Sequence, residues 1–117
     1  MGREKSYRPS IDLWVNAAQL LAAINYVRGI YGKALSVSSG YRPGVFNRAA
    51  GGAVGSAHES CEAIDLHDVD GAFAEWCLGN LEILEKAGLY LEDPEHTQGW
   101  VHLQTRAPKS GKRVFIP

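Results

Sequence analysis

The sequence predicts an α+β fold in which helices pack on a small, mainly antiparallel sheet. Apolar residues recur with helical spacing in two stretches, 11–31 and 73–87. Between and after these stretches, short segments alternate apolar and polar residues as half-buried strands do, and 63–67 and 100–104 are the clearest of them. This order of helix, strand, loop, strand, helix and further strands is typical of an α+β fold.

Length and composition are those of one globular domain. The chain has 117 residues, 45% hydrophobic and 21% charged, so we expect a single domain over 1–117 with a modest core. Residues 1–9 are polar, and we expect them to be frayed. With 12 basic and 13 acidic residues the net charge is −1, which indicates neither a nucleic acid nor a membrane surface as partner. No apolar run reaches the length of a membrane span, and no signal peptide is recognisable at the amino terminus.

The first predicted element is a helix over 11–31. Pro9 and Ser10 offer its start, Asp12 lies in the first turn, and Gly32 suits the left-handed position that ends many helices. Its apolar residues follow the 3.6-residue period of a helix. They are Ile11, Leu13, Trp14, Ala17, Ala18, Leu20, Leu21, Ile24, Val27 and Tyr31.

A short strand and a long loop follow this helix. Residues 34–38 alternate Leu35 and Val37 with smaller residues, which predicts a strand. The turn-rich segment 40–44 leads to a helical turn expected over 45–50. The glycines at 51, 52 and 55 then interrupt regular structure, either to let backbone approach a ligand or simply as a flexible loop.

The second half of the chain predicts one more helix and several strands. Asp70 is a suitable cap for a helix over 73–87, which Gly88 ends. A short strand over 89–91 and a polar loop over 92–99 precede the strand 100–104. The last elements expected are a turn over 108–112 and an edge strand over 114–116.

Three residues with metal-binding side chains have a suggestive arrangement. His58 lies in a small, polar loop, and Asp65 lies on a strand facing opposite to its two apolar neighbours. His102 likewise faces opposite to its two apolar neighbours on the later strand. Each residue has an ordinary alternative role, as a surface loop histidine, a strand-end carboxylate and a half-buried histidine, but a metal explains all three at once. Two imidazoles and one carboxylate suit a zinc site with an open fourth position.

These motifs resemble those of the zinc D,D-peptidase/Hedgehog superfamily. Ser56-x-His58-x6-Asp65 is followed by Trp100-x-His102, and Ser39-Gly40-Tyr41-Arg42-Pro43 comes before them, so that the similarity runs from about residue 37 to 104. Members include D-alanyl-D-alanine carboxypeptidases, dipeptidases and phage endolysins that cut peptidoglycan stem peptides. The resemblance implies a Hedgehog/D,D-peptidase-like fold, with Zn²⁺ held by His58, Asp65 and His102. It also implies that Arg42 binds the substrate and stabilises developing charge.

The catalytic base is where the sequence departs from these relatives. Many members carry an acidic residue three positions before the last ligand, which here is Gly99, and others carry a histidine two positions before it, which here is Trp100. The ionisable residues left in the preceding loop are Glu92, Asp93, Glu95 and His96. Of these, we favour Glu92 because it directly follows a predicted strand, and His96 is the second choice.

Several other residues near these motifs have open roles. Cys61 stands where relatives usually carry glycine, so it needs an allowed backbone conformation there, and a role as a metal ligand stays open. Cys77 is expected in the core. His67 is either a surface residue or a partner of a metal ligand, and Trp100 either lines a cleft or packs in the core. The charged side chains expected in solvent are Glu59, Glu62 and Lys109.

Two functions of different classes follow. The first is a zinc-dependent peptidase that hydrolyses an amide bond in peptidoglycan stem peptides, synthesised in the cytoplasm without a signal peptide and delivered to the cell wall as a phage or prophage product. The alternative is a non-catalytic zinc-binding module, for example in a phage tail, which the departures at Gly99 and Trp100 favour. A soluble α+β domain without any metal is a third possibility.

Overall fold

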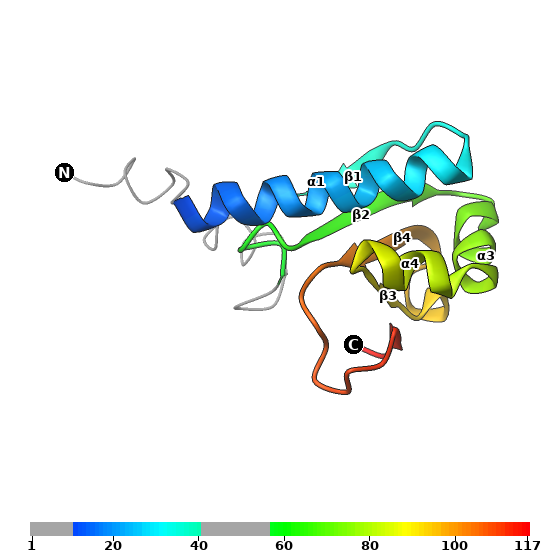
Figure 1. Cartoon of the computed structure of the whole chain (residues 1–117). Helices are drawn as coiled ribbons and strands as arrows, with labels where there is room; N and C mark the ends of the chain where they lie inside the picture. The colour runs from blue at the N-terminus through cyan, green and yellow to red at the C-terminus, as the bar shows by residue number, and fades with distance from the viewer. Residues whose placement is uncertain (1–10, 41–56) are drawn as a thin grey trace.

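The computed structural model describes residues 11–40 and 57–117, and these form a five-stranded sheet with helices on one face (Figure 1). The strand order is β1-β2-β4-β3-β5, and every neighbouring pair is antiparallel except β3 and β5. The predicted α+β fold with a mainly antiparallel sheet is therefore confirmed. Elements in chain order are α1 (Ile11–Tyr31), β1 (Val37–Ser39), β2 (Ala63–Asp68), α3 (Ala72–Gly79), α4 (Leu81–Ala87), β3 (Tyr90–Glu92), the 3₁₀ helix η2 (Pro94–His96), β4 (Gly99–Gln104) and β5 (Val114–Phe115).

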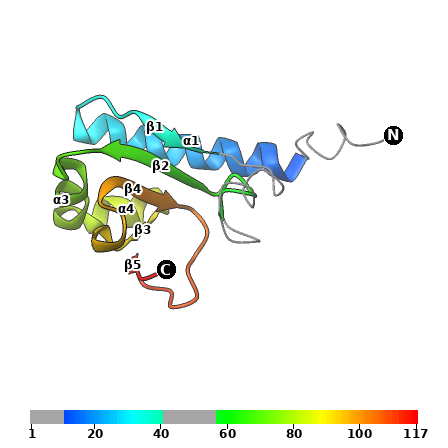
Figure 2. The same cartoon turned by 180° about the vertical axis from the view of Figure 1, so that it is seen from behind.

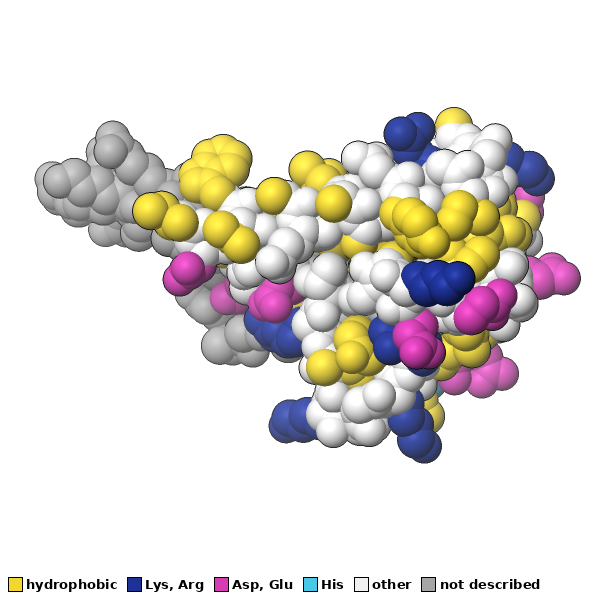
Figure 3. Space-filling view, in the orientation of Figure 1, with side chains coloured by type: hydrophobic (Ala, Val, Ile, Leu, Met, Phe, Trp, Pro, Cys, Tyr) yellow, Lys and Arg dark blue, Asp and Glu magenta, His cyan; other side chains and the backbone are white. Residues whose placement is uncertain are grey.

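Helix α1 has the predicted bounds and lies along the sheet. The side chains that it buries recur at i, i+3, i+4 and i+7 and are those of Leu20, Ala23, Ile24 and Val27. Gly32 adopts a φ of 79°, and its N–H donates to the carbonyl of Arg28, which ends the helix as expected. Apolar side chains also gather on the outer surface of α1 (Figure 3), where Trp14 is 63% exposed. No helix in the described parts of the chain is long and apolar enough to cross a membrane.

The single helix predicted over 73–87 is instead two helices, α3 and α4, that meet at Asn80. Asn80 has a non-helical backbone (φ −136°, ψ 43°), and its side-chain amide donates to the carbonyl of Trp76. Its own carbonyl accepts from Ile83 and so starts α4. Glycine at 79 and asparagine at 80 are weak helix formers, so little is lost when the chain turns there to pack Leu84 into the core. Gly88 ends α4 with a φ of 78°, as predicted.

The start of α3 depends mainly on Asp68. Its carboxylate accepts from the backbone N–H groups of Phe73 (3.0 Å) and Ala74 (2.9 Å), which the helix itself leaves without partners. Asp70, the predicted cap, accepts only from Ala72 at 3.1 Å. The capping carboxylates therefore come from the end of β2 and the turn after it.

The sheet has two chemically different faces because its side chains alternate. Strands β2 and β4 pair over six residues, with Asp65 opposite His102. Ile64, Leu66 and Leu103 point to the face covered by α1 and α4 (Figures 1 and 2) and belong to one hydrophobic core. Asp65 and His102 consequently point to the opposite face, which Figure 2 shows without helices over β2 and β4.

Other boundaries differ modestly from the prediction. The first strand covers Val37–Ser39 rather than 34–38, because pairing with Leu66 and Asp65 of β2 begins at Val37. The loop predicted over 92–99 contains η2, which Asp93 caps by accepting from the N–H of Glu95. The expected frayed segment 1–9 and the expected turn over 45–50 lie outside the described residues. That 1–117 forms one domain stays a prediction.

Candidate metal centre

His58 is held in a tight turn just before β2. The N–H of Glu62 donates to the carbonyl of Ala57 (2.8 Å), which closes the turn, and Cys61 inside it has a φ of 60°. A positive φ is costly for any residue other than glycine, which explains why glycine suits this position. His58 is only 4% exposed, and its Nδ1 lies 2.7 Å from the carbonyl oxygen of Gly40. Because a carbonyl can only accept, Nδ1 of His58 carries the hydrogen and donates.

Asp65 lies between the two histidines. Its Oδ2 is 3.2 Å from Nε2 of His58, and its Oδ1 is 2.8 Å from Nδ1 of His102. The two imidazole rings meet edge to face, with centroids 5.3 Å apart. The nitrogen and oxygen atoms that these three residues offer all lie within 4.8 Å of one another. A turn and two strands, far apart in sequence, thus bring together the three predicted ligands.

In each histidine ring, the outer nitrogen, which points away from Asp65, is hydrogen-bonded, and this leaves the inner nitrogen facing the cluster. Nε2 of His102 lies 2.7 Å from Oε1 of Gln104, an acceptor, just as Nδ1 of His58 lies against the carbonyl of Gly40. With these hydrogens on the outer nitrogens, Nε2 of His58 and Nδ1 of His102 face the Asp65 carboxylate. Lone pairs that converge in this way repel one another unless a proton or a cation lies among them. The donor set of two imidazoles and one carboxylate therefore fits a divalent metal such as zinc.

The electrostatics of the cluster reflect the same convergence. Burial alone would raise the pKa of Asp65, but hydrogen bonds with His102 and His58 and their positive charge outweigh it and lower that pKa to about 2. For His102, burial favours the neutral ring, but hydrogen bonds to Asp65 and Gln104 outweigh burial and raise its pKa. The cluster thus keeps a carboxylate charged and attracts a positive charge beside it.

Glu92 lies on the same face of the sheet, on the strand next to His102. Strands β3 and β4 pair Leu91 with Leu103, both buried, so the next residue of β3 lies beside His102 on the opposite face. Burial raises the pKa of the half-buried Glu92. The charges that also act on its carboxylate are Asp65, which raises the pKa further, and His102, His96 and His58, which oppose the rise. Glu92 is thus electrostatically coupled to all three residues of the cluster.

Of the other two predicted catalytic residues, only His96 lies within the described part of the chain. His96 is exposed on η2, and its charge acts on Glu92. Arg42 lies outside the described residues, so its predicted role as a substrate-binding residue stays a prediction.

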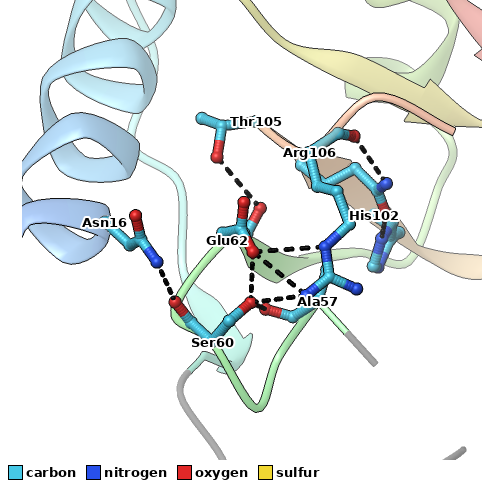
Figure 4. Close-up of polar contacts among 8 residues, drawn as sticks. Asn16, Ala57, Ser60, Glu62, His102, Thr105 and Arg106 are labelled. Carbon is cyan, nitrogen blue, oxygen red and sulfur yellow. Dashed lines mark hydrogen bonds and ion pairs between the residues drawn. The ribbon is translucent and has the colours of Figure 1, made fainter. Parts of the chain in front are cut away.

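A polar network that the sequence did not reveal supports the turn of His58 (Figure 4). The guanidinium of Arg106 donates to Oε1 of Glu62 (3.0 Å) and to Oγ of Ser60 (2.8 Å). Asn16 of α1 donates to the carbonyl of Ser60, and the N–H of Thr105 donates to the carbonyl of Glu62. The prediction that Glu62 is a solvated charge is therefore wrong, because it is half-buried and paired with Arg106.

The remaining residues with open roles are now placed. Cys61 is buried but does not belong to the described metal-binding cluster. Cys77 is fully buried in the core, as expected. Burial, and then the charge of Asp68, raise the pKa of Cys77 to about 12. His67 is exposed on β2 opposite Trp100, which is 38% exposed rather than packed in the core.

An α+β fold whose sheet carries a His–Asp–His cluster on the face opposite α1 and α4 is suited to a metal-dependent hydrolase. The comparisons with known proteins agree: the family model described as peptidase M15 matches residues 3–104, so the chain belongs to this family of metallopeptidases. The predicted membership of the zinc D,D-peptidase superfamily is thereby confirmed. No curated protein and no solved structure matches the chain.

Proposed function

We propose that this protein is a zinc-dependent peptidase that hydrolyses an amide bond next to a D-amino acid in peptidoglycan stem peptides. One observation carries the proposal: metal-binding atoms of His58, Asp65 and His102 converge within 4.8 Å in a chain of the peptidase M15 family. The peptidoglycan substrate rests on the resemblance of the motifs to wall-cutting relatives. Delivery to the wall as a phage or prophage product belongs to the same proposal.

Zinc would be held by Nε2 of His58, the Asp65 carboxylate and Nδ1 of His102. When bound in such a site, zinc lowers the pKa of a water molecule and polarises a carbonyl group. The protein's part is to keep the two imidazoles correctly turned. Hydrogen bonds to the Gly40 carbonyl and to Gln104 do this by holding hydrogens on the outer nitrogens.

Glu92 is the residue that we assign as general base. Its half-buried carboxylate has a raised pKa, as suits a group that accepts the proton of an attacking water and returns it to the leaving amine. Many relatives carry an acidic residue three positions before the last ligand, whereas here the neighbouring strand β3 brings one to the same face. Glu92 would take the role of the acidic residue that the sequence lacks at position 99, and this favours the enzyme over a non-catalytic zinc module. His96 is the second candidate because it is exposed and less fixed.

Arg42 completes the proposed set by resemblance to the family. A guanidinium there would bind a substrate carboxylate with two hydrogen bonds or stabilise the charge that develops on the carbonyl oxygen. Trp100 is partly exposed on the same strand as His102 and would contribute an apolar wall for the substrate.

The test is incubation of the zinc-loaded protein with stem peptides that end in D-Ala-D-Ala and, separately, with intact sacculi. Release of free D-alanine indicates a carboxypeptidase, and release of larger fragments indicates an endopeptidase. The matched control is Glu92→Gln loaded with the same zinc. If the zinc-loaded wild type cleaves neither substrate, the peptidase proposal fails, and the non-catalytic zinc module replaces it.

A further inference from the structure

Gln104 has an amide group whose orientation is fixed at both ends. It ends β4, is 8% exposed, and lies two residues after His102, so both side chains are on the same face of the strand. Its Nε2 donates to the carbonyl oxygen of Arg106 at 2.8 Å. Because that carbonyl can only accept, the amide nitrogen must point there, and Oε1 must point to His102, 2.7 Å from Nε2.

This orientation determines which nitrogen of His102 can bind a metal. Oε1 of Gln104 accepts a hydrogen bond, so Nε2 of His102 carries a hydrogen and has no lone pair to offer. In the neutral ring Nδ1 then has the lone pair that a metal can use, and it is the nitrogen that lies 2.8 Å from Asp65 inside the cluster. A donor at position 104 would favour the opposite tautomer, which places a hydrogen on Nδ1 and blocks coordination.

We propose that Gln104 is a positioning residue that holds the hydrogen of His102 on Nε2 and so makes Nδ1 its metal-binding nitrogen. This inference rests on the metal site of the proposed function. Arg106 extends the arrangement, since its carbonyl anchors Gln104 while its guanidinium holds Ser60 and Glu62 in the turn of His58 (Figure 4). Arg106 therefore holds in place residues that lie near both imidazoles.

Two substitutions separate the hydrogen bond from the packing of the side chain. Gln104→Leu keeps most of the volume and removes the acceptor, whereas Gln104→Glu keeps an acceptor. Losing a partner of a metal-binding histidine typically weakens metal affinity by about 10–100-fold. In competition with a chromogenic chelator, we expect that loss for Gln104→Leu and a smaller one for Gln104→Glu, which keeps an acceptor for His102 but loses the hydrogen bond to the Arg106 carbonyl. Gln19→Leu, at an exposed position of α1, is the matched control and should bind zinc as the wild type does.

Nitrogen NMR gives a direct readout that needs no variant of Gln104. In the zinc-bound wild type, long-range ¹H–¹⁵N spectra should show His102 with a protonated Nε2 and a metal-bound Nδ1. The His102 signals are assigned by their absence from a His102→Ala sample. Zinc bound through Nε2 would overturn the proposal even if Gln104→Leu failed to fold.

Thermal unfolding with and without zinc separates positioning from simple packing. A positioning role predicts that Gln104→Leu mainly reduces the rise in Tm on adding zinc. An equal loss of Tm in the chelator-treated and zinc-loaded protein, with unchanged zinc affinity, would instead mean that Gln104 only fills space. Affinity and NMR do not depend on turnover, so a protein that binds zinc through Nδ1 but cleaves no peptide would refute the proposed function and leave the role of Gln104 intact.

Discussion

Asp65 and His102 lie directly opposite each other on adjacent antiparallel strands, with Oδ1 of the aspartate 2.8 Å from Nδ1 of the histidine. Two of the three proposed ligands are thus fixed by the pairing of β2 and β4, and only His58 comes from a turn. Strands hold side chains more precisely than loops do. The site therefore has most of its geometry before any metal arrives.

Glu92→Gln should abolish most peptidase activity while zinc content stays unchanged. Loss of a general base typically lowers the rate by about 10²–10⁴-fold. The measurement is kcat/KM on a stem peptide, beside zinc content, with Glu95→Gln on the exposed side of η2 as control. Full activity of Glu92→Gln, together with loss in His96→Ala, would move the role of base to His96.

Acid should destabilise the metal-free protein partly through Asp65. The pKa of Asp65 falls from 3.8 to about 2 on folding, so this carboxylate stabilises the fold above about pH 4 and loses that contribution as the pH falls towards 2. The urea midpoint of chelator-treated wild type should drop more steeply over this window than that of Asp65→Asn. Parallel curves for the two proteins would show that Asp65 is not ionically paired in the folded state.

The Glu62–Arg106 pair should contribute modestly to stability and more visibly to zinc binding. Both side chains are partly exposed (25% and 39%), so a double-mutant cycle should give a coupling energy of about 0.5–1 kcal/mol. Because the pair holds the turn of His58, Glu62→Gln should also weaken zinc binding severalfold, whereas Glu85→Gln on the surface of α4 should not. Zinc affinities equal in both variants would separate this network from the metal site.

Leu103→Ala should strongly destabilise the fold. Leu103 is fully buried between the sheet and the helices, and truncating such a side chain costs about 2–5 kcal/mol. Ile116→Ala, at a side chain that is 72% exposed, should change stability by less than about 0.5 kcal/mol. Denaturant unfolding of the metal-free proteins measures both, and a small effect at Leu103 would contradict the assigned core face.

Local periodicity was sufficient to predict α1 and the faces of the two central strands. Helical spacing located Val27 in the core, and alternation placed Asp65 and His102 on the face opposite their apolar neighbours. The break at Asn80 was missed because an apolar stripe continues across it, and periodicity cannot show that packing favours a turn there.

The hydrogen bonds that hold the metal-binding residues in place could not be predicted from local sequence, because they join residues far apart in the chain or depend on the folded backbone. Arg106 and Glu62 are separated by 44 positions, and nothing in the pattern around either residue indicates the other. Gln104 looked like an ordinary polar strand residue; only the positions of His102 and the Arg106 carbonyl show what its amide does. The alternation that put His102 on the open face would also have put Gln104 there.

The most direct test of the central claim is the zinc content of freshly purified protein, compared with His102→Ala. His67→Ala, which removes an exposed histidine from β2, is the matched control. We predict about one zinc per chain in the wild type and in His67→Ala, as expected for three protein ligands that leave a fourth position open, and loss of that zinc in His102→Ala. Absence of zinc from the wild type after zinc is supplied, or zinc retained in full by His102→Ala, would contradict the site.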